Sequence, residues 1–240
     1  GELVFTAFSG SHQDAIRKCL QQRDPSAQWN VAYLPLDPAD LGRRYEEVVR
    51  INSQSGKGGV THILERDYNI NLPRWLQIDF AHQVQKQAED SGGEIDSLTI
   101  HKLFREHYAN IPAGWRLVSY DLHRQGETVT ATIEFGDDIS TIVSGSGHGA
   151  LEALAAALES RFGIHIAVEA YDEFALSEGT DAKALACIKL SINNKGYSAV
   201  ATTEDTTTAT LQVLLNSVGR FEQDLGFEHS KPMASGASLA

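Results

Sequence analysis

The sequence has few cysteines, a single methionine and no long hydrophobic run. Its two cysteines, Cys19 and Cys187, are too few for a disulfide framework and suit a reducing compartment. No apolar run approaches the ~18 residues of a membrane span, and the first residues lack the basic region of a signal peptide. We therefore expect a cytoplasmic protein with no membrane partner.

Positive charge is also scarce, since 20 lysines and arginines against 32 acidic residues give a formal net charge of -12. Such a surface repels phosphate backbones and anionic lipids, so we expect neither nucleic acid nor membrane as a partner. The sequence begins at Gly1, and its only methionine is Met233. We therefore expect that a preceding part of the protein is missing here and holds the main chemistry.

The first half of the sequence predicts short helices. Ser11 and Asp14 form a capping-box-like pair, so Ser11 is expected to cap a helix whose first turn holds His12. Apolar spacing predicts helices over 41–51, 72–87 and 97–108, a short strand over 60–64, a packed extended segment over 29–38 and a loop or hinge over 52–59.

The pattern changes near Pro112 to alternating strands and two amphipathic helices. Strands are predicted over 115–123, 127–135, 140–144, 164–171, 182–192 and 197–202, with helices over 150–162 and 206–221. Val143, Leu154 and Leu158 match Val200, Leu211 and Leu215, each pair 57 residues apart (200−143, 211−154, 215−158). The predicted fold is α+β, with small helical subdomains followed by a duplicated βββα domain in pseudo-twofold packing.

A glycine-rich turn, residues 144–151, separates the third strand from its helix. Gly145, Gly147 and Gly149 allow positive φ angles and close approach of a ligand, and the following helix start favours a carboxylate or phosphate. A tight turn without a ligand explains the same glycines. By the 57-residue spacing, Gly147 to Gly149 fall opposite Glu204 to Thr206.

Two single residues are candidates for chemistry. His12 lies at a helix start beside Ser9, Ser11 and Asp14, where a histidine can exchange a proton near neutral pH, although a solvent-facing histidine fits as well. Tyr33 lies in an apolar stretch, where core packing is the simplest interpretation. The nine histidines show no zinc-binding spacing, so no metal site is predicted.

Three segments resemble a known family. GELVFTAFSGSHQDAI, WNVAYLPLDPADLGRRYEEVVRINSQSGKGGV and SGSGHGAL look like 2-isopropylmalate synthases of the long, leucine-regulated type. The resemblance implies an acyltransferase that condenses acetyl-CoA with 2-oxoisovalerate in leucine biosynthesis. Its TIM barrel, with a divalent metal, would precede Gly1, so this part should be inactive alone and needs no cofactor of its own.

The resemblance also implies a domain plan for a homodimer. It comprises linker subdomains over 1–54 and 55–110, a leucine-binding regulatory domain over 111–226 with halves 111–163 and 164–226, and a flexible tail over 227–240. His12 would assist proton transfer in the partner subunit's barrel, supported by Tyr33. Leucine would bind for feedback inhibition at Gly147, His148, Gly149, Leu151, Val168, Tyr171, Ala175 and Ala182.

The charges of a bound leucine also need partners. Its carboxylate would lie at the helix start after Gly149 or at the equivalent start near Thr206, and Asp181 or Asp205 would pair with its ammonium group. Two alternatives remain open. One is the isoleucine-sensing regulatory region of a citramalate synthase, and the other is a stand-alone module that binds an amino acid or dimerises.

Overall fold

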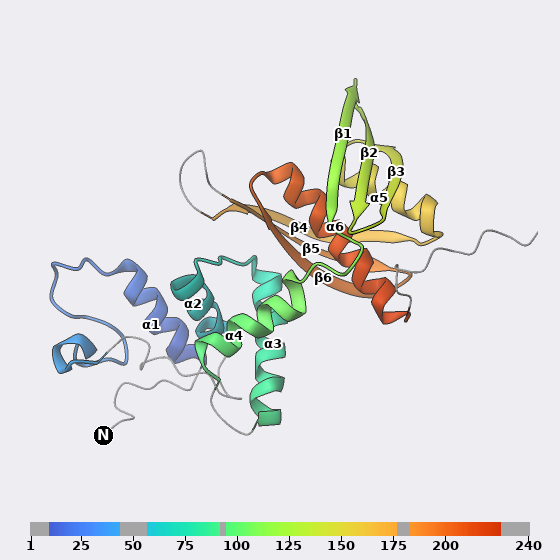
Figure 1. Ribbon diagram of the computed structural model, residues 1–240. Helices are drawn as coiled ribbons and strands as arrows, with labels where there is room; N and C mark the ends of the chain where they lie inside the picture. The colour runs from blue at the N-terminus through green and yellow to red at the C-terminus, as the bar shows by residue number, and fades with distance from the viewer. Residues whose placement is uncertain (1–9, 44–56, 92–94, 177–182, 227–240) are drawn as a thin grey trace, which may run out of the picture. The chain divides into compact units, whose positions relative to one another are not determined.

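The chain divides into two compact units, Gly1–Glu106 and His107–Ala240 (Figure 1). The computed structural model describes residues 10–43, 57–91, 95–176 and 183–226. The predicted boundary at residue 54 and the predicted tail over 227–240 lie outside these residues.

The first unit is built of helices. They are α1 (Gly10–Gln22), the 3-10 turn η2 (Pro38–Leu41), α2 (Lys57–Tyr68), α3 (Arg74–Ser91), α4 (Ser97–Phe104) and the π turn η4 (Arg105–Ala109), which runs into the second unit. Their core contains Leu76, Phe80 and Val84, which are buried and lie four residues apart on one face of α3. The predicted helices at 72–87 and 97–108 are thus confirmed.

Three sequence predictions in this unit are wrong. Residues 60–64 belong to α2 rather than to a strand, because Gly58–Leu64 are all buried and a helix buried on all sides loses its periodicity. Lys57–Gly59 start this helix instead of ending a loop, and a Cβ on Gly58 would lie 2.8 Å from that of Asp14. Ser11 does not cap α1, which already begins at Gly10.

The predictions for residues 29–51 are confirmed only in part. Within the predicted helix over 41–51, Leu41 ends η2, its C-cap Gly42 is left-handed at φ 67°, and residues 44–51 lie outside the described residues. The segment 29–38 contains no α-helix, as predicted, and it buries Val31 and Leu34. Tyr33, however, is 59% exposed, so its predicted place in the core is wrong.

The second unit contains two three-stranded antiparallel sheets, ordered β1-β2-β3 and β4-β5-β6, each followed by a helix. The strands are β1 (Leu117–Gln125), β2 (Thr128–Gly136), β3 (Ser140–Gly147), β4 (Ile166–Ala175), β5 (Ala184–Ile192) and β6 (Lys195–Thr203), and the helices are α5 (Ala150–Phe162) and α6 (Thr206–Asp224). The predicted α+β fold with two βββα halves is confirmed.

The duplication is real, but its predicted spacing is wrong by one residue. The helix caps Gly149 and Asp205 are 56 residues apart (205−149), as are the helix starts Ala150 and Thr206 (206−150). With this spacing Val143 corresponds to Ala199, and both belong to the shared core. Val200 is buried but not part of that core, because successive strand residues point to opposite faces.

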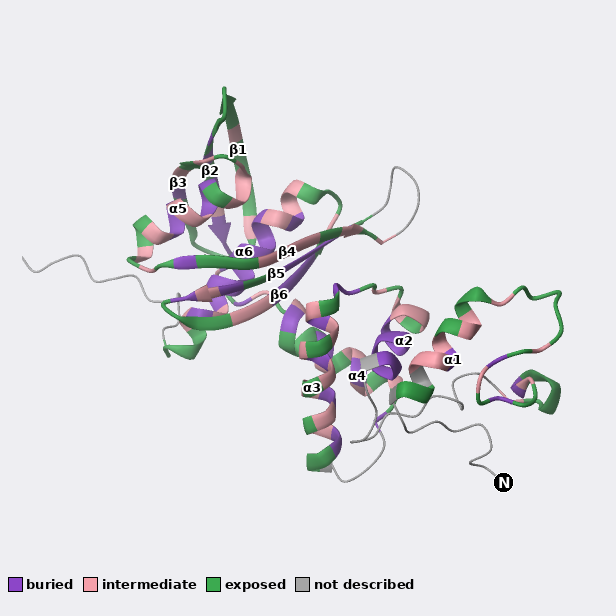
Figure 2. Ribbon diagram, turned by 180° about the vertical axis from the view of Figure 1, so that it is seen from behind, coloured by how far each residue is buried: buried purple, intermediate pink, exposed green. Residues whose placement is uncertain are grey.

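α6 is the most deeply buried helix of the second unit, with every residue from Leu211 to Gly219 buried (Figure 2). Its polar side chains satisfy backbone groups at the edges of both sheets. Gln212 accepts from the Leu117 N–H at 2.8 Å, and Asn216 donates to the Val200 carbonyl at 3.1 Å. The helix therefore covers edge strands β1 and β6, whose outward backbone groups would otherwise be unpaired.

No described helix is long and apolar enough to cross a membrane.

Candidate functional site

The glycine turn joins β3 to α5 by very close packing. A Cβ on Gly145 would lie 2.4 Å from the Ala153 carbonyl oxygen, and one on Gly147 would lie 2.7 Å from the Cβ of Glu152. None of the three glycines at positions 145, 147 and 149 has a positive φ angle, so the predicted backbone reason for them is wrong. Gly145 and Gly147 are needed because helix and strand leave no room for a side chain there.

The start of α5 has no side-chain cap at its N-cap residue. Gly149 is the N-cap residue and provides no side-chain acceptor for the first helical N–H groups. Instead Glu152 reaches back, and its carboxylate accepts from the His148 N–H at 2.7 Å. A Cβ on Gly149 would meet nothing within 4 Å, so the N-cap position is open.

The equivalent start of α6 is closed by its own side chains. One oxygen of Asp205 accepts from the Thr208 N–H at 2.8 Å, and the other accepts from the Thr208 hydroxyl at 2.6 Å. These hydrogen bonds hold the pKa of the Asp205 carboxyl below its usual value. Thr203, which matches Gly147 in the 56-residue spacing, donates its hydroxyl to the Asp205 carbonyl at 2.7 Å.

β4 carries three of the residues predicted to bind a ligand. Val168 is 42% exposed, and Ala175 ends the strand with its side chain exposed. The Tyr171 hydroxyl lies 2.6 Å from the Thr210 hydroxyl of α6 and donates to Glu173 at 2.9 Å. Burial raises the pKa of Tyr171 to about 12, so this hydroxyl stays protonated.

Of the remaining residues predicted to bind leucine, the structure describes some and not others. Leu151 packs against the same core as Tyr171, whereas Ala182 and Asp181 lie outside the described residues. Sequence reasoning missed Thr210 and Glu152, whose side chains contact the predicted site. The only available signal for Thr210 was a run of threonines, poor helix formers, at a predicted helix start.

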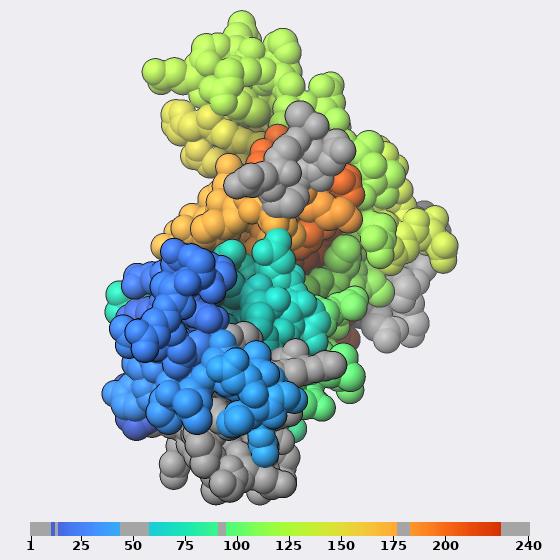
Figure 3. Space-filling view, turned by 90° about the vertical axis from the view of Figure 1, so that its left-hand side faces the viewer, coloured from blue at the N-terminus to red at the C-terminus, as the bar shows by residue number. Residues whose placement is uncertain are grey.

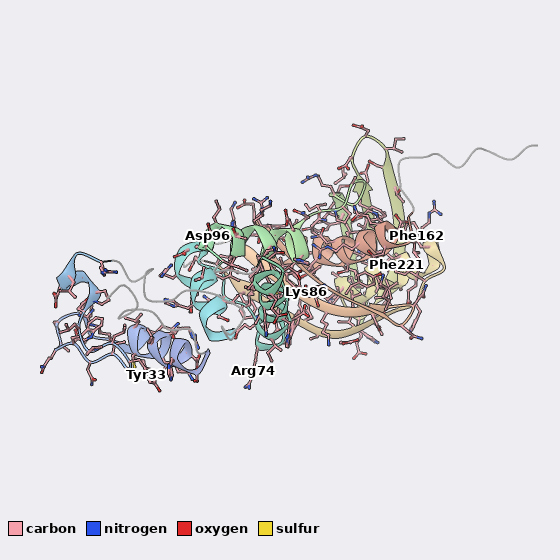
Figure 4. The ribbon with its side chains drawn as sticks, turned by 90° about the horizontal axis from the view of Figure 1, so that it is seen from below. Tyr33, Arg74, Lys86, Asp96, Phe162 and Phe221 are labelled. Carbon is pink, nitrogen blue, oxygen red and sulfur yellow. The ribbon has the colours of Figure 1, made fainter. Side chains whose placement is uncertain are left out.

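The structure brings His12 and Tyr33 together in the first unit. Their rings stack with centroids 4.0 Å apart and planes at 24°. His12 is exposed in the first turn of α1, and the Tyr33 side chain lies beside this helix (Figure 4). In the space-filling view the surface of α1 and that of the following segment adjoin (Figure 3).

Tyr33 is held in an unusual backbone conformation. Its φ angle of 64° is rare for a bulky residue and costs roughly 1–3 kcal/mol. The surrounding turn is fixed by a Leu34 N–H to Val31 carbonyl bond of 3.1 Å and by the Trp29 indole, which donates to the Leu34 carbonyl at 2.7 Å. Such bracing keeps the tyrosine ring at the surface.

No group of three or more histidine, cysteine, aspartate or glutamate side chains suited to a metal occurs among the described residues.

Comparison with protein families gives two matches along the chain. The alpha-isopropylmalate synthase, post-catalytic domain-like family matches residues 2–65, and the LeuA allosteric (dimerisation) domain matches residues 94–222. The chain belongs to the LeuA allosteric (dimerisation) domain family. The second match contains both βββα halves, and the first contains His12 and Tyr33.

Individual relatives agree with these domains. The chain is 55% identical over 225 residues to a 2-isopropylmalate synthase of Alcanivorax borkumensis, covering 93% of this chain and 40% of that protein. It is 42% identical to the enzyme of Pseudomonas fluorescens, covering 92% of this chain and 40% of that protein. The enzyme of Paraburkholderia phytofirmans is 41% identical over 92% of this chain and 38% of its own length. The chain thus spans about 40% of the length of these relatives.

Proposed function

We propose that this chain forms the post-catalytic and regulatory region of a 2-isopropylmalate synthase that condenses acetyl-CoA with 2-oxoisovalerate and is inhibited by leucine. The observation that supports this most is the 55% identity to such an enzyme over 93% of the chain. The condensation needs a divalent metal, whose ligands we expect outside this chain. The chain would act as a homodimer, in keeping with the dimerisation family that it matches.

Leucine binding is proposed at the glycine turn and β4. Asp205 already accepts two hydrogen bonds at the start of α6, whereas Gly149 leaves the start of α5 without a side-chain acceptor. We therefore place the leucine carboxylate at α5, near Gly147, His148 and Gly149, on the first helical N–H groups, because the His148 N–H already binds Glu152 and the helix dipole favours a negative charge. The engagement of Asp205 leaves Asp181 as the preferred partner of the ammonium group.

The leucine side chain would lie against Leu151, Val168, Tyr171, Ala175 and Ala182. Burying an isobutyl group contributes roughly 1.5–3 kcal/mol, and the charged groups provide the specificity. Half-exposed Val168 and the small side chain of Ala175 leave room for such a group at the edge of β4.

Titration calorimetry tests the ligand. The 240-residue chain is titrated with leucine, isoleucine and valine in parallel. We expect leucine to bind tightest and to raise the melting temperature by mass action. Tighter binding of isoleucine would instead favour a citramalate synthase, and the absence of heat and of a thermal shift with leucine would refute the regulatory site.

His12 and Tyr33 are proposed to act together at a catalytic site in the partner subunit. The imidazole, stacked on the phenol at 4.0 Å, would transfer a proton while Tyr33 fixes its orientation. In the full-length enzyme, His12→Ala should lower kcat by ~10²-fold or more, and Tyr33→Phe should have a smaller effect. His82, which lies on α3 outside this pair, provides the control, since His82→Ala should leave kcat unchanged. An unchanged kcat in His12→Ala would make the histidine a surface residue.

A further inference from the structure

Arg220 is an arginine held by backbone oxygens. Its Nη1 donates to the carbonyl oxygen of His107 and to that of Ser198, the latter at 3.3 Å. Among the described residues its closest polar contacts are these carbonyls, the charge of Asp224 acts on it favourably, and its Nη2 is buried without a hydrogen-bond partner. Partly burying a guanidinium that donates to carbonyl oxygens rather than directly to a carboxylate is unfavourable, so the position calls for a reason other than stability.

The acceptor at His107 lies where the chain enters the second unit. His107 is the first residue of that unit and falls within the π turn Arg105–Ala109. Isolated π turns are uncommon and occur frequently at functional positions. Arg220 thus ties the beginning of the second unit to its last helix.

The rest of this leading segment, residues 107–117, is also bound along α6. A Cβ on Gly219 would lie 2.6 Å from the Trp115 ring, which shows how closely the indole packs there. The Trp115 indole donates to Glu222 at 3.2 Å, and Gln212 donates to the Trp115 carbonyl at 2.9 Å. Because these contacts lie from Gln212 to Glu222, the segment cannot shift without α6.

The opposite end of α6 reaches the proposed ligand site. Thr210, in the second turn, contacts the hydroxyl of Tyr171 at 2.6 Å. From Thr210 to Arg220 the helix rises by about 15 Å, at 1.5 Å per residue. Every residue from Leu211 to Gly219 is buried, so this part of α6 moves as one rigid body.

We infer that Arg220 is a positioning residue. It couples the proposed leucine site, at Tyr171 and Thr210, to the joint at His107, where the chain passes from the first unit into the second. A ligand that displaces Tyr171 and Thr210 shifts α6, and Arg220 carries the shift to the carbonyl where the chain leaves for the first unit. The inference rests on the proposed leucine site, because a ligand changes an equilibrium only by binding its two states differently.

The test uses the full-length synthase that contains this chain, with leucine as the ligand. In Arg220→Gln the side-chain amide cannot span both carbonyls, so the joint is released while the ligand residues are untouched. We expect the leucine dissociation constant by calorimetry to stay within about threefold, while the activity that remains at saturating leucine rises at least about tenfold, because bound leucine no longer acts through the joint. Arg220→Lys, which keeps the charge and one donor, should show an intermediate loss of inhibition and guards against misfolding of the first variant.

Arg161→Gln is the matched control, since Arg161 lies in the last turn of α5 and stacks on Phe162 of its own helix. It should bind leucine and be inhibited as the unmodified enzyme is. Normal inhibition of Arg220→Gln, with normal binding, would overturn the inference and leave the leucine site intact. Loss of leucine binding in both Arg220 variants would overturn it as well, by placing Arg220 in the ligand site. If the unmodified enzyme itself fails to bind leucine, the proposed function fails, and the inference with it.

Discussion

In the first βββα half the helix begins at Gly149, which has no side chain, whereas in the second half it begins at Asp205, which caps it twice. The two halves share their order of elements and one core. Their difference lies in the turn, where Gly147 and Gly149 match Thr203 and Asp205 at the 56-residue spacing (203−147, 205−149). One copy of the turn thus has side chains that close the helix start at these positions, and the other has glycines there.

The halves also differ in how closely the helix approaches its sheet. Gly145 corresponds to Ala201 (201−145 = 56), and Ala201 fits its methyl group into the core. In the first half that methyl group would meet the backbone of α5 at 2.4 Å. α5 therefore lies closer to β3 than α6 lies to β6, and only glycine permits this approach.

Replacing Gly145 by alanine, the residue at the equivalent position of the second half, should have the largest effect on stability. Gly145→Ala forces helix and strand apart and is expected to lower the free energy of unfolding by about 3 kcal/mol, the upper range for overpacking. Gly196→Ala is the control, because a Cβ there meets nothing within 4 Å and β6 favours alanine over glycine. Urea denaturation of both variants checks the difference. Equal stabilities would mean that α5 moves away at no cost.

Closing the open helix start should weaken leucine binding. In Gly149→Asp the new carboxylate can accept from the Glu152 N–H as Asp205 does from Thr208, since Gly149 has a φ of −154° and open space around it. It would occupy the donors proposed for the leucine carboxylate and repel that group, so we expect affinity to fall at least about tenfold, or ~1.4 kcal/mol.

Gly149→Asn separates the two causes, because an asparagine caps the helix without a charge. Calorimetry should give an affinity between those of the unmodified chain and Gly149→Asp. An unchanged dissociation constant in Gly149→Asp would place the leucine carboxylate elsewhere.

β2 and α5 could be predicted because each buries one face and so shows a clear period. α6 could be predicted although Leu211–Gly219 are all buried, because its sequence is too long for a strand. α2 could not, because Gly58–Leu64 are all buried and no polar face marks its turns. The sequence favours a spacing of 57 residues because leucines match at that offset, whereas the helix caps Gly149 and Asp205 define a spacing of 56. A one-residue error of this kind exchanges the two faces of a strand.

The candidate sites were predictable only as separate residues. Sequence placed His12 in the first turn of a helix, but the 4.0 Å stacking on Tyr33 depends on a turn that holds the tyrosine at a φ of 64°. Likewise the contact between Tyr171 and Thr210 joins a strand to a helix 39 residues later. Contacts of this kind follow from tertiary packing, which no local pattern contains.

Acidification should remove the charged cap that distinguishes the start of α6 from that of α5. We expect this change to have the smallest effect on stability. The folded pKa of Asp205 lies below its unfolded value, because the carboxylate accepts from Thr208. Its capping is therefore fully present above the unfolded pKa of about 3.9 and is lost as the pH falls through the folded value. Since Asp205 is exposed and its charge is screened by water, we expect a contribution below about 1 kcal/mol.

Asp205→Asn, which caps without titrating, should lose less stability than the unmodified chain between neutral pH and about pH 3 in urea denaturation. Identical losses in the two proteins would show that Asp205 stabilises α6 without its charge, and the contrast with Gly149 would then rest on hydrogen bonding alone.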